Sequence, residues 1–167
     1  MTFPWPEFSS WSLKHVICVP EQMVIDGNFP TVASPNPENP EGFALAVELA
    51  NKEGADFILG SDPDADRVGL MVRAGDGFKV LTGNQTGVLL LDYLIGAKQR
   101  TGKMPQNPVA LKTIVTTEMA RKVAEVNGLQ CFLQAVQAGH HQVHGALAVI
   151  AVLLVQGQQG VVQGHTL

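Results

Sequence analysis

Three aspartates occupy alternate positions in a short segment between two apolar runs. The segment 60–67 reads Gly-Ser-Asp-Pro-Asp-Ala-Asp-Arg, and its acidic residues are Asp62, Asp64 and Asp66. Carboxylates this close together repel one another unless protons or a divalent ion compensate their charge. Oxygen ligands of this kind suit a hard cation such as Mg²⁺ or Mn²⁺ better than a thiophilic metal. The spacing therefore predicts a divalent metal site.

The neighbours of the aspartates give the loop its shape. Pro63 stiffens the backbone and Ala65 keeps the loop slim. Arg67 follows the last carboxylate, and its planar guanidinium is suited to two roles. It either anchors one of the aspartates or donates two hydrogen bonds to a phosphate oxygen pair, and the sequence leaves both roles open.

Other acidic loops share part of this pattern. A calcium EF-hand needs Gly at its sixth position and a carboxylate at its twelfth, but counting from Asp62 these are Arg67 and Arg73, which excludes it. A phosphatase of the haloacid dehalogenase type needs Thr or Val two residues after its second Asp, where this chain has Asp66, and is the runner-up. A solvated acidic turn without a ligand is the remaining alternative. Three aspartates, a following arginine and a strand on each side favour the metal site over it.

The residues around the loop predict an α/β unit. We expect a short strand over 15–19 and a helix that begins with Asn39 as its cap and stops at Gly54. Strands over 56–60 and 68–72 then flank the acidic loop. In α/β folds ligands gather in loops at the ends of strands, which is where the aspartates lie.

A second set of elements follows along the chain. We expect a helix over 84–97, a strand over 109–115, and a helix that Thr116 or Thr117 caps and that ends at Asn127. The residues of the first helix expected to face inward are Val88, Leu91, Leu94 and Ile95. The predicted fold class is thus α/β, with mixed sheet layers and flanking helices.

The acidic loop resembles the metal-binding loop of the α-D-phosphohexomutases, the family of phosphoglucomutase and phosphomannomutase. It is the variant with Pro63 and Ala65 where other members have Gly. Further blocks appear in the family's order and, together with the loop, cover roughly residues 13–132: Val19-Pro20-Glu21-Gln22, Asp26–Val32, Pro35–Glu38, Thr82–Gln85 and Thr113–Ala120. Several blocks in one order are far more specific than a single loop.

The resemblance implies two incomplete phosphohexomutase-type α/β units. The expected division is an irregular N-terminal tail over 1–12, the C-terminal part of domain 2 with the metal loop over 13–75, the start of domain 3 over 76–132, and a biased tail over 133–167.

The resemblance also implies an activity. Members of the family interconvert hexose 1-phosphate and hexose 6-phosphate: a phosphorylated serine gives its phosphoryl group to the sugar, the bisphosphate intermediate turns around, and the serine takes back the other group. By this resemblance Asp62, Asp64 and Asp66 hold Mg²⁺, Arg67 is the active-site arginine, and a phosphosugar is the substrate with a hexose 1,6-bisphosphate as activator.

The family's catalytic serine is missing from this sequence. It lies in a Ser-His-Asn-Pro-like loop of a first domain that would precede Met1, and no such motif occurs in the chain. We therefore expect a partial and inactive piece of a mutase. The alternative is a standalone module that binds Mg²⁺ and phosphosugar without chemistry. The sequence does not distinguish between sugars and leaves the oligomeric state open.

Composition narrows the class of partner and the compartment. The net charge is −4 and the isoelectric point is near 5.7, which argues against a nucleic-acid partner. Cys18 and Cys131 lie far apart and suit reduced thiols in a cytoplasmic protein. The apolar run Ala146–Val155 has about half the length of a membrane span, so we expect no membrane partner.

The composition changes abruptly near the end of the chain. From Leu133 onward there is no Asp, Glu, Lys or Arg, although four of the five histidines fall there. Three of them, His140, His141 and His144, are spaced as helical metal ligands would be, but an accidental cluster in a biased segment is the favoured interpretation. We interpret the switch as a frameshift or gene-model error near Phe132.

Overall fold

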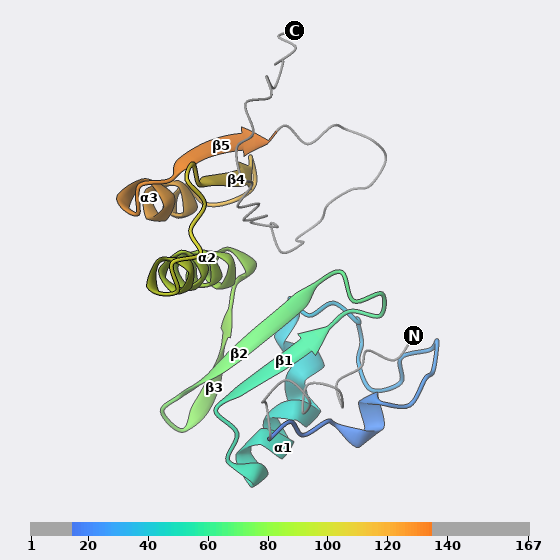
Figure 1. The fold of residues 1–167 in the computed structure, drawn as a ribbon. Helices are drawn as coiled ribbons and strands as arrows, with labels where there is room; N and C mark the ends of the chain where they lie inside the picture. Colours follow the sequence, from blue (N-terminus) through green and yellow to red (C-terminus); the bar gives the residue numbers. More distant parts are fainter. Residues whose placement is uncertain (1–14, 135–167) are drawn as a thin grey trace, which may run out of the picture. The chain divides into compact units, whose positions relative to one another are not determined.

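In a computed structural model, residues 15–134 are described, and they fall into two compact units divided between Thr82 and Gly83 (Figure 1). Both units combine helices with strands, so the α/β class predicted from the sequence is confirmed. Each unit is described by itself below. The predicted features of the tails, at 1–12 and from residue 135 on, lie outside the described residues.

The first unit is built on a three-stranded antiparallel sheet. Its strands are β1 (Phe57–Ser61), β2 (Val68–Ala74) and β3 (Gly77–Leu81), in the order β1-β2-β3 (Figure 1). The last pair between the first two strands is Ser61 with Val68, so the acidic segment is the connection between β1 and β2. The short 3₁₀ helices η2 (Pro20–Gln22) and η3 (Pro40–Phe43) and the helix α1 (Ala44–Glu53) precede the sheet.

Helix α1 packs on this sheet through its apolar residues. Side chains of the helix pack with buried residues of β1 and β2. This core contains Phe43, Ala50, Ile58 and Met71. The helix stops at Gly54, which adopts the left-handed conformation with φ of 70°. The prediction that Asn39 caps the helix is wrong in its detail. The chain first makes a 3₁₀ turn, in which Gly42 N–H donates to Asn39 O, and the Asn39 side chain makes no cap hydrogen bond.

Arg73 ties the end of α1 to the sheet. Its guanidinium donates to the carbonyls of Ala55 at 2.9 Å and Ala50 at 3.1 Å and lies 4.5 Å from the centre of the Phe78 ring. These bonds satisfy carbonyls at the negative end of the helix, where a cation is favourable. The strand therefore fixes the helix electrostatically as well as by apolar packing.

The predicted strand over 15–19 is absent from the structure. These residues form no strand, and Val16 and Ile17 are exposed. Pro20 lacks an amide hydrogen that a strand would use for pairing, and it begins η2. The chain therefore turns here instead of continuing as a strand.

A pair of glycines brings the segment 35–38 against the base of the acidic loop. Gly60 and Gly69 lie opposite each other in the β1–β2 register. A Cβ on Gly60 would lie 2.8 Å from the Phe43 ring, and a Cβ on Gly69 would overlap the carbonyl oxygen of Pro37. The absence of side chains at these two positions thus allows Phe43 and buried Pro37 to pack directly on the hairpin backbone.

The second unit packs two helices with a two-stranded parallel sheet. Its elements are α2 (Gly83–Arg100), β4 (Val109–Thr113), α3 (Glu118–Val126) and β5 (Gln130–Gln134). The core is formed by Leu91, Ile95, Ala110, Ala120, Ala124 and Leu129. The predicted inward position of Leu94 is wrong, because this side chain is exposed at the border of the helix face that Leu91 and Ile95 bury.

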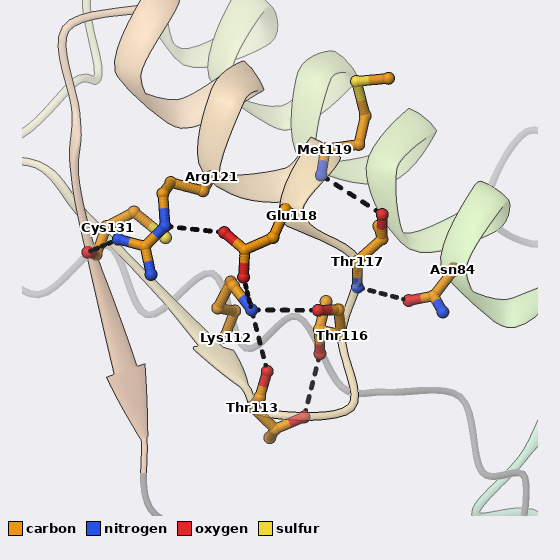
Figure 2. Close-up of polar contacts among 9 residues, drawn as sticks. All are labelled: Asn84, Lys112, Thr113, Thr116, Thr117, Glu118, Met119, Arg121 and Cys131. Carbon is orange, nitrogen blue, oxygen red and sulfur yellow. Dashed lines mark hydrogen bonds and ion pairs between the residues drawn. The ribbon is translucent and has the colours of Figure 1, made fainter.

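A buried lysine lies at the end of β4. Lys112 is 2% exposed, and its ammonium contacts Thr113 O at 3.2 Å, Thr116 O at 3.0 Å and Glu118 Oε1 at 2.8 Å (Figure 2). Three acceptors match the three donors of an ammonium group. The second oxygen of Glu118 accepts from Arg121 Nε at 2.9 Å. This network joins β4 to α3 by ionic contacts.

Three further hydrogen bonds set where β4 ends and α3 begins. The strand was expected to reach residue 115 but ends at Thr113, because Thr116 N–H donates to Thr113 O and turns the chain. Of the two predicted caps, Thr116 and Thr117, it is Thr117 that caps α3, with its hydroxyl accepting from Met119 N–H at 3.2 Å. Asn84 Oδ1 accepts from Thr117 N–H at 2.9 Å and so fixes the start of α3 on α2 (Figure 2).

Among residues 15–134, no helix is both long enough and apolar enough to cross a membrane.

The glycine pair yields a test of the packing. Gly69→Ala should lower the free energy of unfolding by about 1–3 kcal/mol, because the new Cβ forces apart two segments of backbone rather than a flexible side chain. Urea denaturation of the purified chain measures it. Gly77→Ala is the matched control, since a Cβ on Gly77 meets no atom within 4 Å, and it should change stability by less than about 0.5 kcal/mol. Equal effects of the two changes would contradict the packing argument.

The lysine network yields a pH prediction. Hydrogen bonds from Lys112 and then Arg121 hold the pKa of Glu118 below its ordinary value of 4.5. A lowered folded-state pKa contributes stability above the ordinary value, and this contribution is lost as the pH falls through the folded value. Glu118→Gln should therefore destabilise the chain at neutral pH, and this effect should disappear as the pH falls below 4.5 through the lowered folded-state pKa of Glu118. Denaturation curves across this range check it.

Glu125→Gln is the control for the pH prediction. Glu125 has only a 3.5 Å contact with exposed Lys122, so the difference from the wild-type chain should stay small throughout. A difference in unfolding free energy between Glu118→Gln and the wild-type chain that does not change with pH would contradict the role of the network.

Candidate metal centre

The acidic loop is the hairpin connection between β1 and β2, and its backbone turns sharply. Ala65 N–H donates to Asp62 O at 3.1 Å, which closes a turn within the loop. Ala65 itself has a φ of 60°, a left-handed backbone conformation that residues other than glycine rarely adopt. The turn reverses the chain over few residues and so brings the side chains on either side of it together.

The structure brings the three predicted metal ligands together. One carboxylate oxygen from each of Asp62, Asp64 and Asp66 lies within 4.8 Å of the others. Oxygens that share a Mg²⁺ ion at roughly 2.1 Å lie within about 4.2 Å of one another, so a small closure of the loop is enough. The donor set is all oxygen and all acidic, which fits a hard divalent cation.

The three aspartates differ in their surroundings. Asp62 is buried, with a side chain that is 0% exposed, whereas Asp64 and Asp66 are exposed. The loop therefore has one fixed carboxylate at its base and two that face solvent. This division was not visible in the sequence, in which the three positions are equivalent.

Arg67 binds both oxygens of Asp62. Its backbone N–H donates to Oδ1 at 3.0 Å and its Nε–H donates to Oδ2 at 2.6 Å. The same Nε lies 3.6 Å from Asp66 Oδ1, a longer and more exposed ion pair. Of the two roles that the sequence left open for Arg67, the structure shows the anchoring of an aspartate.

The pKa values follow from these contacts. Burial by itself raises the pKa of Asp62, but the hydrogen bonds from Arg67 outweigh it and hold that pKa below its ordinary value. The neighbouring Asp62 carboxylate, which can accept a hydrogen bond from Asp66 when Asp66 is protonated, raises the pKa of Asp66, and partial loss of hydration and the negative charges of Asp62 and Asp64 act in the same direction. One carboxylate is thus kept ionised while a neighbour accepts a proton more readily.

Sequence reasoning missed the support behind the loop. Pro37 packs on Gly69 directly after the loop, and the preceding Asn36 Oδ1 accepts from Glu38 N–H at 3.0 Å to form a tight turn. The signal was present as two glycines placed symmetrically about the acidic segment, at Gly60 and Gly69, but their pairing depends on the register of the hairpin.

The segment that contains this hairpin matches a known protein family. A sequence model described as "Phosphoglucomutase/phosphomannomutase, alpha/beta/alpha domain II" matches residues 5–75, which include the whole acidic loop. A solved structure of a phosphoglucomutase/phosphomannomutase family protein from Burkholderia thailandensis superposes with a TM-score of 0.53 at 20% identity, over 68% of this chain and 22% of that chain. This likeness shows the α/β fold.

Curated relatives extend the match into the second unit. A phosphomannomutase from Mycoplasmoides pirum is 38% identical over 119 residues, which are 71% of this chain and 21% of that protein. A phosphoglucomutase from Staphylococcus aureus (strain USA300) is 38% identical over 124 residues, 74% of this chain and 21% of that protein. The chain thus matches a fragment of the phosphoglucomutase/phosphomannomutase family, and it spans about a fifth of the length of these relatives.

The strained loop position yields a further test. Ala65→Gly should raise the free energy of unfolding by about 1 kcal/mol, because glycine adopts the left-handed conformation without the Cβ clash. Ala74→Gly, at the end of β2, is the control and should lower it by about 0.5–1 kcal/mol. Urea denaturation without added metal measures both. A loss of stability for Ala65→Gly as large as that of the control would contradict the strain.

Proposed function

We propose that this chain is part of a phosphosugar mutase that interconverts hexose 1-phosphate and hexose 6-phosphate. The observation that carries the proposal is the hairpin loop with three convergent carboxylates in the segment that matches the family. We further propose a phosphosugar substrate, a hexose 1,6-bisphosphate activator, neither nucleic acid nor membrane as a partner, and a cytoplasmic location. The chain by itself is proposed to be inactive, since it contains no Ser-His-Asn-Pro-like loop.

The residues of the loop have separate tasks in this proposal. Asp62, Asp64 and Asp66 hold Mg²⁺, which when bound draws charge from a transferring phosphoryl group. Arg67 donates to Asp62 through its backbone N–H and its Nε–H. The two terminal nitrogens of its guanidinium make no hydrogen bond with the described residues. Those nitrogens form a two-pronged donor suited to a phosphate group.

Two alternatives differ in what the loop does. A standalone module that binds Mg²⁺ and phosphosugar is favoured by the fact that all three carboxylates come from one hairpin of one unit. A phosphatase that forms an acyl-phosphate on Asp62 is disfavoured, because that class needs Thr or Val two residues after its second Asp, where this chain has Asp66.

The metal role is tested by changing the exposed ligand. Asp64→Asn should weaken Mg²⁺ binding, measured by calorimetry, by at least about tenfold, because one of three charged ligands becomes neutral. Asp64 is exposed, so folding should be preserved. Asp76→Asn, an exposed aspartate in the β2–β3 turn, makes the same change in net charge and should leave binding unchanged. Equal binding by the two variants would contradict a metal site at the loop.

The mutase role is tested by transplantation. The segment Ser61–Arg67 replaces the aligned loop of the Staphylococcus aureus phosphoglucomutase, and conversion of hexose 1-phosphate to hexose 6-phosphate is measured with the bisphosphate activator. The chimera should retain turnover, and the same chimera with Asp64→Asn should lose about 100-fold or more. The 167-residue chain should show none. An inactive but folded chimera would contradict the assignment, and turnover by the chain alone would contradict the need for the missing serine.

A further inference from the structure

Arg67 and Asp62 make a closed pair that is unlike the other contacts of the loop. The arginine uses its backbone N–H and its side-chain Nε–H on the two different oxygens of one carboxylate. Two bonds from one residue fix the plane and the direction of the carboxylate, whereas one bond would leave it free to rotate. The Asp62 side chain is also fully buried, so solvent does not compete for these bonds.

The other two aspartates lack such an anchor. Asp66 is 71% exposed and meets the guanidinium only at 3.6 Å, and Asp64 is exposed without any hydrogen bond to the described residues. Side chains of this kind retain rotamer freedom in the metal-free loop. The loop is thus divided into a carboxylate that is already set and two that are free to adjust.

We propose that Arg67 is a positioning residue of the metal loop: it presets the Asp62 carboxylate for the divalent ion, while Asp64 and Asp66 close on the ion when it arrives. This inference rests on the proposed metal function. Each Asp62 oxygen accepts one bond from Arg67 and keeps a second lone pair for a metal. The pair therefore persists in the metal-bound state instead of being exchanged for the ion.

The sign of one measurement separates this role from simple charge compensation. A guanidinium close to the site repels a cation. If Arg67 contributed only its charge, its removal would tighten metal binding. If it positions Asp62, its removal loosens the one preset ligand and weakens binding in spite of the relieved repulsion.

Lysine separates the two roles further. Arg67→Lys keeps the positive charge and the backbone N–H but has no Nε–H group in the same plane, so it cannot hold both oxygens in the observed geometry. Positioning by Arg67 predicts weaker metal binding for this variant too. Charge compensation predicts no change.

The experiment is a calorimetric titration of the full chain with Mn²⁺ and with Mg²⁺. We expect both Arg67→Lys and Arg67→Gln to bind at least about tenfold more weakly than the wild-type chain. Lys79→Gln is the matched control, because this exposed lysine of β3 lies in the same unit, and its binding should be unchanged. Wild-type affinity in Arg67→Lys, or tighter binding in Arg67→Gln, would overturn the inference.

A measurement on the wild-type chain keeps the test independent of how the variants fold. The Nε–H proton of Arg67 should remain protected from solvent exchange when Mg²⁺ saturates the site, as followed by ¹⁵N-resolved NMR. Loss of this protection on metal binding would mean that the ion replaces the arginine and would overturn the inference. If the wild-type chain binds neither metal, the proposed function fails first and the inference fails with it.

Discussion

Repulsion among three aspartates in one short hairpin connection is the constraint on which the first unit depends. Two features of the fold answer it without a bound ion. Arg67 neutralises the buried Asp62 through two hydrogen bonds, and the remaining two carboxylates face solvent, where water screens them. A buried carboxylate without such a partner would cost several kcal/mol, so the loop conformation and the arginine depend on each other.

The hairpin that carries the loop is held from behind by backbone rather than by large side chains. Gly60 and Gly69 let Phe43 and Pro37 approach the strands, and Arg73 clamps the end of α1 to the same sheet. The acidic loop therefore stands on strands whose position is set by close packing. Such support fixes the base of the loop, where Asp62 lies, and leaves the exposed Asp64 and Asp66 free to adjust.

The second unit solves a different electrostatic problem by similar means. Lys112 lies on the buried face of β4 and is stabilised by two carbonyl groups and Glu118, which in turn accepts from Arg121 (Figure 2). The hydrogen bond from Thr116 N–H to Thr113 O ends β4, and the Thr117 cap begins α3. Strand propensity predicted that β4 continues through Ile114 and Val115, which are good strand formers. The turn that begins at Thr113 outweighs this propensity, and β4 ends there.

The sequence by itself determined the α/β class, the helices α1, α2 and α3, a threonine cap at position 116 or 117, and the gathering of three aspartates in one loop, because these depend on local periodicity, caps and residue type. Only the tertiary structure decided that Asp62 is buried and anchored while Asp64 and Asp66 are exposed. It also decided that residues 15–19 form no strand and that Asn39 is no side-chain cap. These outcomes depend on strand register and on which segments become neighbours, and residues far apart in the sequence set both.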